Sequence, residues 1–124
     1  MVFRTAFRIV GCAADAEDVS QEVFAEAFCQ AKSREIIHWA AWLRKLAVFR
    51  ALDRRRRQRA NVSLNADVLA STELSPHDEA VRRELAERLR DMISALPKRE
   101  GAVFALRYLE RLSNPQIAQT LGIS

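Results

Sequence analysis

Apolar residues recur every three or four positions in the first third of the chain, which is the spacing of one buried helix face. The pattern predicts a helix over residues 2–11 and a second from about residue 15, with Asp15 as its N-cap. A long helix over about 36–59, with no Gly or Pro inside it, follows. The apolar stripe expected on the second helix consists of Val19, Val23, Phe24, Ala27 and Phe28.

The helical period stops in residues 60–77, where Ser, Asn, Thr and Pro accumulate. This composition is typical of a linker. Ser75 and Pro76 have the order of an N-cap and first helical residue, so a further helix is predicted to run to about Leu96. Its apolar positions in register are Val81, Leu85, Leu89, Met92, Ile93 and Leu96.

The last quarter of the chain has the pattern of two short helices. Pro97 ends the preceding helix, and another is expected to continue to about Glu110. Ser113 and Gln116 have capping-box spacing before a short helix, and Gly122 stands where that helix would end. A helix followed by Gly, an apolar residue and Ser is typical of the first half of a helix-turn-helix.

Composition agrees with an all-α protein. The chain of 124 residues is 49% hydrophobic and 29% charged, and it contains only three Gly and three Pro. We therefore predict two small helical domains, over residues 1–60 and 78–124, joined by a flexible linker over 61–77.

Charge is concentrated in one block. Residues 31–60 hold ten of the twenty Lys and Arg residues against two acidic ones, and Arg54–Arg57 are followed by Gln58 and Arg59. Like charges this close repel one another unless an anion shares them, so the block favours binding to a nucleic-acid backbone. A membrane surface is the less favoured alternative.

Other classes of function find little support in the sequence. No apolar run is long enough to cross a bilayer, and Arg4 and Arg8 interrupt the N-terminal apolar stretch, so we expect no membrane insertion, no signal peptide and a cytoplasmic protein. Cys12 and Cys29 lack neighbours at metal-ligand spacing. Without a nucleophile, base or phosphate loop in a recognisable arrangement, we expect no catalytic site, metal or cofactor.

Three segments resemble bacterial sigma factors of the extracytoplasmic-function (ECF) type. DAEDVSQEVFAEAF (15–28) is similar to the polymerase-binding helix of sigma region 2, and WLRKLAVFRALDRRRR (42–57) resembles the promoter-melting helix, typically WLxxIAxNxxxDxxRR. LPKREGAVFALRYLERLSNPQIAQTLGIS (96–124) resembles the start of region 4. The resemblance covers residues 1–60 and 79–124, and the short linker is typical of the ECF group.

The resemblance implies a first partner, core RNA polymerase. The face formed by Asp18, Gln21 and Glu22 would meet basic side chains on the β′ clamp helices, where opposite charges steer association. An anti-sigma factor is a further candidate partner.

The second implied partner is promoter DNA, including the melted non-template strand at the minus-ten element. The segment 32–39 would hold a flipped base, with Trp39 touching it, whereas Trp42 and Leu43 would pack inside. The residues expected to contact DNA are Lys32, Arg34, Trp39, Arg44, Lys45, Arg50, Arg54, Arg56 and Arg57.

In the region 4-like domain, Ser113, Gln116 and Ile117 would belong to the helix that positions a recognition helix in the major groove. Two positions depart from the family pattern: Phe49 replaces the usual Asn, and Gln116 the usual Glu. Because the recognition helix would start at Ser124 and the family normally has another helical stretch before Val2, we expect a chain truncated at both ends.

Two alternatives remain open. The chain could be a truncated sigma-like interaction module that binds polymerase or an anti-sigma factor without selecting promoters. It could also be a helix-turn-helix regulator that acts without polymerase, which would be expected to dimerise and bind duplex DNA alone.

Overall fold

The computed structural model describes residues 1–61 and 78–122, and every regular element in these ranges is helical. The first three helices are α1 (Val2–Val10), α2 (Ala13–Ser33) and α3 (Trp39–Asn61). The others are α4 (Asp78–Ala95), α5 (Lys98–Phe104), the π-helical turn η2 (Ala105–Leu109) and α6 (Asn114–Leu121). The predicted all-α fold is confirmed. The predicted Ser75–Pro76 cap lies outside the described residues.

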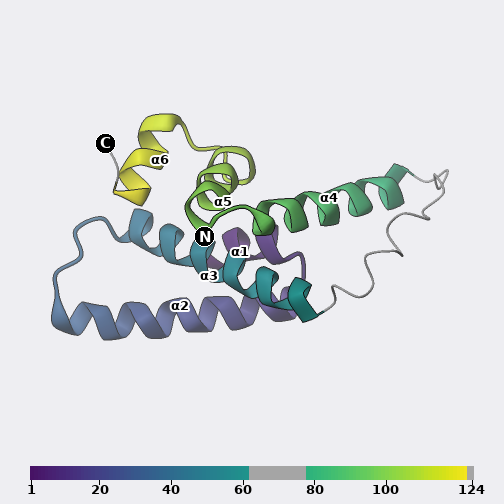
Figure 1. Cartoon of the computed structure of the whole chain (residues 1–124). Helices are drawn as coiled ribbons and strands as arrows, with labels where there is room; N and C mark the ends of the chain where they lie inside the picture. The colour runs from purple at the N-terminus through teal and green to yellow at the C-terminus, as the bar shows by residue number, and fades with distance from the viewer. Residues whose placement is uncertain (62–77, 123–124) are drawn as a thin grey trace.

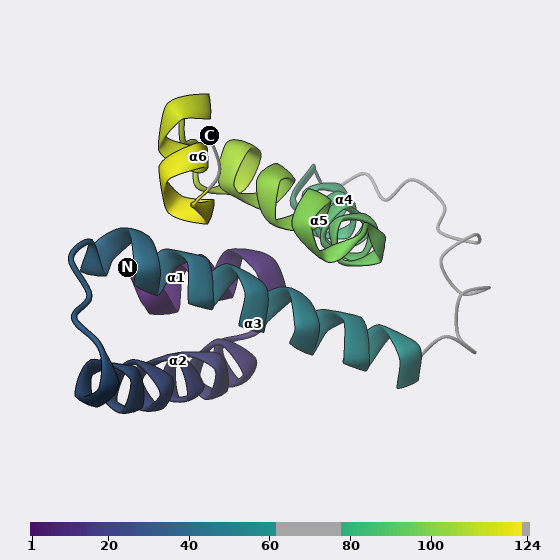
Figure 2. The same ribbon diagram turned by 60° about the vertical axis from the view of Figure 1, so that its left-hand side comes forward.

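The two groups of helices form two layers. Figures 1 and 2 both show α1, α2 and α3 together on one side and α4, α5 and α6 stacked above them. The long helix α3 lies at the boundary between the layers and contacts every other α-helix. Position in the fold therefore makes α3 the element through which the two groups can influence one another.

One hydrophobic core runs through both layers. From the first layer it includes Val19, Val48 and Leu52, and from the second Ile93 and Leu106, all at most 2% exposed. Full burial of one such side chain contributes about 1.5–3 kcal/mol to the stability of the fold. The two layers are thus joined by apolar packing as well as by the chain.

Two helix starts differ from the prediction. Cys12, in extended conformation, is the N-cap of α2, so Asp15 lies in the first turn rather than at the cap. A carboxylate there still favours the positive end of the helix dipole, which explains why the sequence pattern was ambiguous. Helix α3 begins at Trp39, about three residues later than expected, and leaves Ile37 80% exposed in the preceding loop.

The predicted apolar stripes are only partly buried. On α2, Val19, Val23 and Ala27 are buried, but Phe24 and Phe28 are 54% and 66% exposed. On α4, the stripe predicted for the core contributes only Ile93 to it, and the exposed positions are Leu85, Leu89 and Met92. The helical period was read correctly, but each stripe is wider than the surface that its neighbours cover.

Candidate functional site

An acidic face lies on the solvent side of α2. Gln21 and Glu22 lie three and four residues after Asp18, so they share a helix face with it, and all three side chains are exposed. Buried Val19 and Val23 anchor the opposite side of the helix. We call Asp18, Gln21 and Glu22 the acidic face; the structure keeps its three members together, as the sequence predicted.

Exposed aromatic rings lie next to the acidic face. Phe24 and Phe28 follow it on α2, and the Lys32 amino group stands 4.5 Å from the centre of the Phe28 ring. Large exposed apolar side chains beside charged ones are typical of surfaces that bind a protein. The sequence predicted both rings as members of the apolar stripe of this helix, so their exposure was not expected.

Arg54 joins the acidic face to the basic helix. Its Nε donates to Asp15 Oδ1 at 3.1 Å, and its Nη2 donates to Asp18 Oδ2 at 2.9 Å. Asp15 also accepts a hydrogen bond from Gln58 Nε2 at 2.8 Å. The Gln58 hydrogen bond and then the Arg54 guanidinium lower the pKa of Asp15 below its ordinary 3.8, against an opposing effect of burial. Asp18 and Arg54, predicted for different partners, are thus bound to each other.

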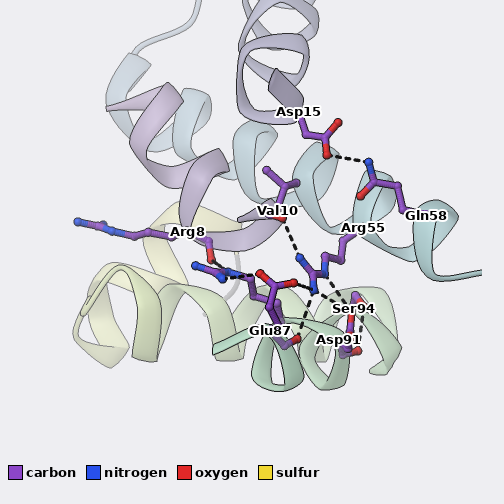
Figure 3. Close-up of polar contacts among 9 residues, drawn as sticks. Arg8, Val10, Asp15, Arg55, Gln58, Glu87, Asp91 and Ser94 are labelled. Atoms are coloured by element: carbon purple, nitrogen blue, oxygen red, sulfur yellow. Dashed lines mark hydrogen bonds and ion pairs between the residues drawn. The ribbon is translucent and has the colours of Figure 1, made fainter. Parts of the chain in front are cut away.

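Arg55 is buried between α1, α3 and α4, as Figure 3 shows. Its Nη1 donates to the Val10 carbonyl at 2.7 Å, and its Nη2 and Nε donate to Glu87 Oε2 at 2.7 Å and Asp91 Oδ1 at 3.0 Å. The planar guanidinium suits this arrangement because it presents several donors in fixed directions. The anions that neutralise this member of the arginine run are therefore carboxylates of the same chain.

Arg56 and Arg57 have contrasting environments. Arg56 donates from Nε to the Ser94 carbonyl at 3.0 Å and from Nη2 to the Leu96 carbonyl at 2.7 Å. These carbonyls lie at the end of α4, where a helix leaves acceptors without partners. Arg57 is exposed. Of the run, Arg57 is the member best placed to meet a phosphate from solvent.

Two further predicted basic residues of α3 lie at a cavity of about 760 Å³. Lys45 and Arg50 line it together with Phe49 and, from α5, Lys98 and Arg99. Arg50 binds Glu26, a contact that raises the pKa of Arg50 and keeps it cationic. Arg44 is half-buried, and its Nε has no hydrogen-bond partner among the described residues. The α5 contribution was not foreseen, because Lys98 and Lys45 are far apart in sequence.

Two tryptophans mark the start of α3. The rings of Trp39 and Trp42 meet edge to face with centres 5.6 Å apart, and Arg34 lies 6.0 Å from the Trp42 ring. Trp39 is 39% exposed and Trp42 is half-buried; the contact of Trp39 with a base stays a prediction. Lys32 and Arg34 are both exposed.

Helix α6 has the predicted caps. Gln116 N–H donates to Ser113 Oγ at 3.3 Å, Ser113 N–H donates to Gln116 Oε1 at 2.8 Å, and Gly122 ends the helix with φ +71°. Ile117 is 4% exposed and anchors α6 to the core. Gln116 therefore works as a cap in place of the usual Glu.

Two properties of the described residues concern metal binding and membrane insertion. Within residues 1–61 and 78–122 there is no cluster of three or more potential metal ligands. No described helix is both long and apolar enough to cross a membrane.

Comparison with known proteins gives matches to two family models and to several curated relatives, two of which are described below. The family model "Sigma-70 region 2" matches residues 1–61, and "Sigma-70, region 4" matches residues 86–124. The ECF RNA polymerase sigma factor SigW of Bacillus subtilis is 28% identical to this chain over an alignment of 134 residues, gaps included. The alignment covers 98% of this chain and 72% of that protein. The ECF RNA polymerase sigma factor SigE of Mycolicibacterium smegmatis is 28% identical over 127 residues, covering 98% of this chain and 49% of that protein.

Proposed function

The chain belongs to the sigma-70 family, in its extracytoplasmic-function group, and from this premise we propose that it docks on core RNA polymerase through the acidic face of α2. As a sigma factor it acts in transcription initiation.

The observation that carries the docking proposal is the exposed surface of α2. Glu22 and Gln21 face solvent beside the two exposed rings Phe24 and Phe28. A basic partner helix would find carboxylates that speed the encounter and apolar rings that hold the complex once formed. The β′ clamp helices of polymerase are the partner that fits this combination.

The loop before α3 and the exposed side of α3 are proposed to hold promoter DNA. Trp39 offers a partly exposed ring on which an unstacked base can stack, and Lys32 and Arg34 provide charge for the strand next to it. Arg57 and Lys45 extend the basic surface along the helix. Base stacking and phosphate contacts together stabilise the melted non-template strand.

Helix α6 is proposed to position a recognition helix for the minus-thirty-five element. Ser113 and Gln116 fix its start by the capping box, and Ile117 fixes its rotation by packing in the core. An anti-sigma factor that controlled this protein would compete with polymerase for the acidic face, or with promoter DNA for α3 and the loop before it.

Glu22→Lys tests the docking surface. Glu22 is preferred to Asp18 because Asp18 is already paired with Arg54, so that its replacement also disturbs α3. We expect Glu22→Lys to reduce capture of the chain by immobilised core enzyme at least about tenfold, the effect of about 1.4 kcal/mol. Glu79→Lys, an equal charge change at an exposed site on α4, is the matched control and should bind normally.

The same proteins are then tested for specific run-off transcription with core enzyme. Wild-type chain that binds core and starts specific transcripts supports the whole proposal. Core binding without transcripts would leave only the interaction module, and equal capture of Glu22→Lys and Glu79→Lys would contradict the docking surface.

A further inference from the structure

The cavity of about 760 Å³ at Phe49 has walls from α2, α3, α5 and α6. We call it the interlayer cavity, because α2 and α3 belong to the first layer and α5 and α6 to the second. Its volume lies within the roughly 300–1,000 Å³ of pockets that enclose small organic molecules. Neither the acidic face of α2 nor the loop before α3 contributes a residue to it.

Four cationic side chains line the interlayer cavity, and two of them are neutralised there. Arg50 of α3 pairs with Glu26 of α2. Lys98 Nζ of α5 lies 3.4 Å from Asp53 Oδ2 of α3. These two pairs join the helices around the cavity, so they act as parts of its wall and add no net charge.

The other two cations are Lys45 of α3 and Arg99 of α5. Within the described parts of the chain neither has an anionic partner. Lys45 is half-buried and Arg99 is exposed. Like charges at one cavity repel each other, and partial burial removes some of the hydration of an ammonium group, so an external anion stabilises both. Two positive charges call for an anion that carries about two negative ones.

Apolar side chains supply the remaining surface that a ligand would meet. Leu46 and Phe49 of α3 and Leu121 of α6 line the cavity. The Lys98 amino group stands 5.3 Å from the centre of the Phe49 ring, so the aromatic surface lies directly beside the charged one. A ligand that fits this combination has a planar organic part and an anionic part joined to it.

We propose that the interlayer cavity binds a nucleoside monophosphate, with the phosphate held by Lys45 and Arg99 and the base against Phe49. A phosphate monoester carries about −1.5 to −2 charges at pH 7, which matches the two unpaired cations. The Arg99 guanidinium can bind two phosphate oxygens at once, and the Lys45 ammonium adds a point charge. This inference is independent of the polymerase-docking surface; it shares Lys45 with the surface proposed for promoter DNA.

Binding of the four nucleoside 5′-monophosphates to the full chain is measured by isothermal titration calorimetry. At least one of them should bind at a single site with a Kd below about 1 mM. Ribose 5-phosphate lacks the base, and the free nucleoside lacks the phosphate, so each should bind at least about tenfold more weakly. If no nucleotide bound at about 1 mM, or if ribose 5-phosphate bound as tightly as the nucleotide, the proposal would be wrong.

Arg99→Gln tests the phosphate end of the site. Because Arg99 is exposed, the substitution should leave the fold unchanged, and it should weaken nucleotide binding at least about tenfold. The matched control is Arg83→Gln, which makes the same charge change at an exposed position of α4 outside the cavity. The control should bind like the wild type. Equal losses in the two variants would mean that only the net charge of the chain matters, and would overturn the site.

Phe49→Asn tests the aromatic wall. It should weaken nucleotide binding about fivefold or more, the usual effect of losing a ring that stacks on a base, and should leave the binding of ribose 5-phosphate unchanged. Circular dichroism checks that the variant is folded, and the comparison of nucleotide with ribose 5-phosphate on the wild-type chain tests the same wall without a substitution. An equal loss for both ligands would contradict the placement of the base against Phe49.

A labelled single-stranded oligonucleotide distinguishes a free nucleotide from a DNA strand as the ligand. Arg57 is exposed on α3 and does not line the cavity. Arg57→Ala should therefore weaken binding of the strand, measured by fluorescence anisotropy, and leave nucleotide binding unchanged. Arg99→Gln should do the reverse. If each variant weakened both ligands to the same extent, the cavity would be a part of the strand-binding surface and the proposed nucleotide site would be wrong.

Discussion

At the scale of single residues, four consecutive arginines of α3 have four different environments. Each step along a helix turns the side chain by about 100°, so neighbours in sequence point to different surroundings. Arg54 meets α2, Arg55 is buried against α1 and α4, Arg56 reaches the end of α4 and Arg57 faces solvent. Charge density in the sequence indicated that anions must lie nearby, but it did not distinguish a phosphate from a carboxylate of the same chain.

Asp15 illustrates the same limit. The sequence placed it correctly at the start of a helix, where an acidic residue is favourable by local rules. Its actual partners, Gln58 and Arg54, come from a different helix about forty residues later, and no local pattern reveals them. Asp15 therefore links α2 to α3 at a point three residues before Asp18 of the acidic face.

The lowered pKa of Asp15 predicts a dependence of stability on pH. A carboxyl with a folded pKa below its ordinary 3.8 stabilises the fold above that value, and this contribution is lost as the pH falls through the lowered pKa. Asp15→Asn should therefore reduce the free energy of unfolding by about 1 kcal/mol at pH 7. The difference from wild type should shrink below about pH 4. Urea unfolding at a series of pH values measures it.

Glu17→Gln, a substitution at an exposed position two residues later on the same helix, serves as the control and should change little at any pH. If the wild-type and Asp15→Asn stability curves remained parallel down to pH 2, Asp15 would not be coupled to Gln58 and Arg54 as the structure indicates.

At the scale of helices, the sequence predicted most of the elements and few of the buried faces. Helical periodicity and the Ser113 capping box depend on residues at most four apart, so they can be read locally. Whether Phe28 or Met92 is covered depends on which helix packs there, and that depends on residues elsewhere in the chain. Both side chains are 66% exposed, although each lies on a correctly predicted apolar stripe.

The close approach of α4 and α5 depends on Gly101. A Cβ at this position would stand 2.9 Å from the Ile93 carbonyl oxygen, which belongs to the backbone and cannot rotate away. In an ordinary helix Gly→Ala stabilises by about 1 kcal/mol. Here we expect Gly101→Ala to destabilise the protein by about 1–3 kcal/mol, the usual cost of overpacking. Chemical unfolding followed by circular dichroism measures the change.

Gly122→Ala is a useful comparison because space is open around it and only its positive φ of +71° disfavours a side chain. Its effect should stay near 1 kcal/mol. A stabilising effect of Gly101→Ala would show that α4 and α5 do not pack as closely as the 2.9 Å between this Cβ and the Ile93 carbonyl oxygen indicates.

At the scale of the whole molecule, the relation between the two layers was outside the reach of the sequence. Arg55 and Asp91 are 36 residues apart, and Arg8 and Glu110 are 102 apart. The sequence predicted two helical domains separated by a polar stretch, but polar composition in that stretch carries no information on whether the two groups pack together. Their packing brings Arg55 and Arg56 of α3 to acceptors on α4.

The contact between the layers predicts that Arg56→Ala destabilises the protein. Arg56 donates to the Ser94 and Leu96 carbonyls, so its removal leaves both acceptors without this partner. We expect the free energy of unfolding to fall by about 1–2 kcal/mol. Urea unfolding followed by circular dichroism measures the change.

The neighbouring Arg57 provides the matched control, because its side chain is exposed. Arg57→Ala should change the free energy of unfolding by less than about 0.5 kcal/mol. On the proposed DNA surface it should weaken strand binding and flatten the salt dependence by about one counterion. Equal destabilisation by Arg56→Ala and Arg57→Ala would show that the Arg56 contacts do not hold α3 to the end of α4. A large effect at Arg56 alone requires that one arginine of the run joins the layers while the next remains available to an external anion.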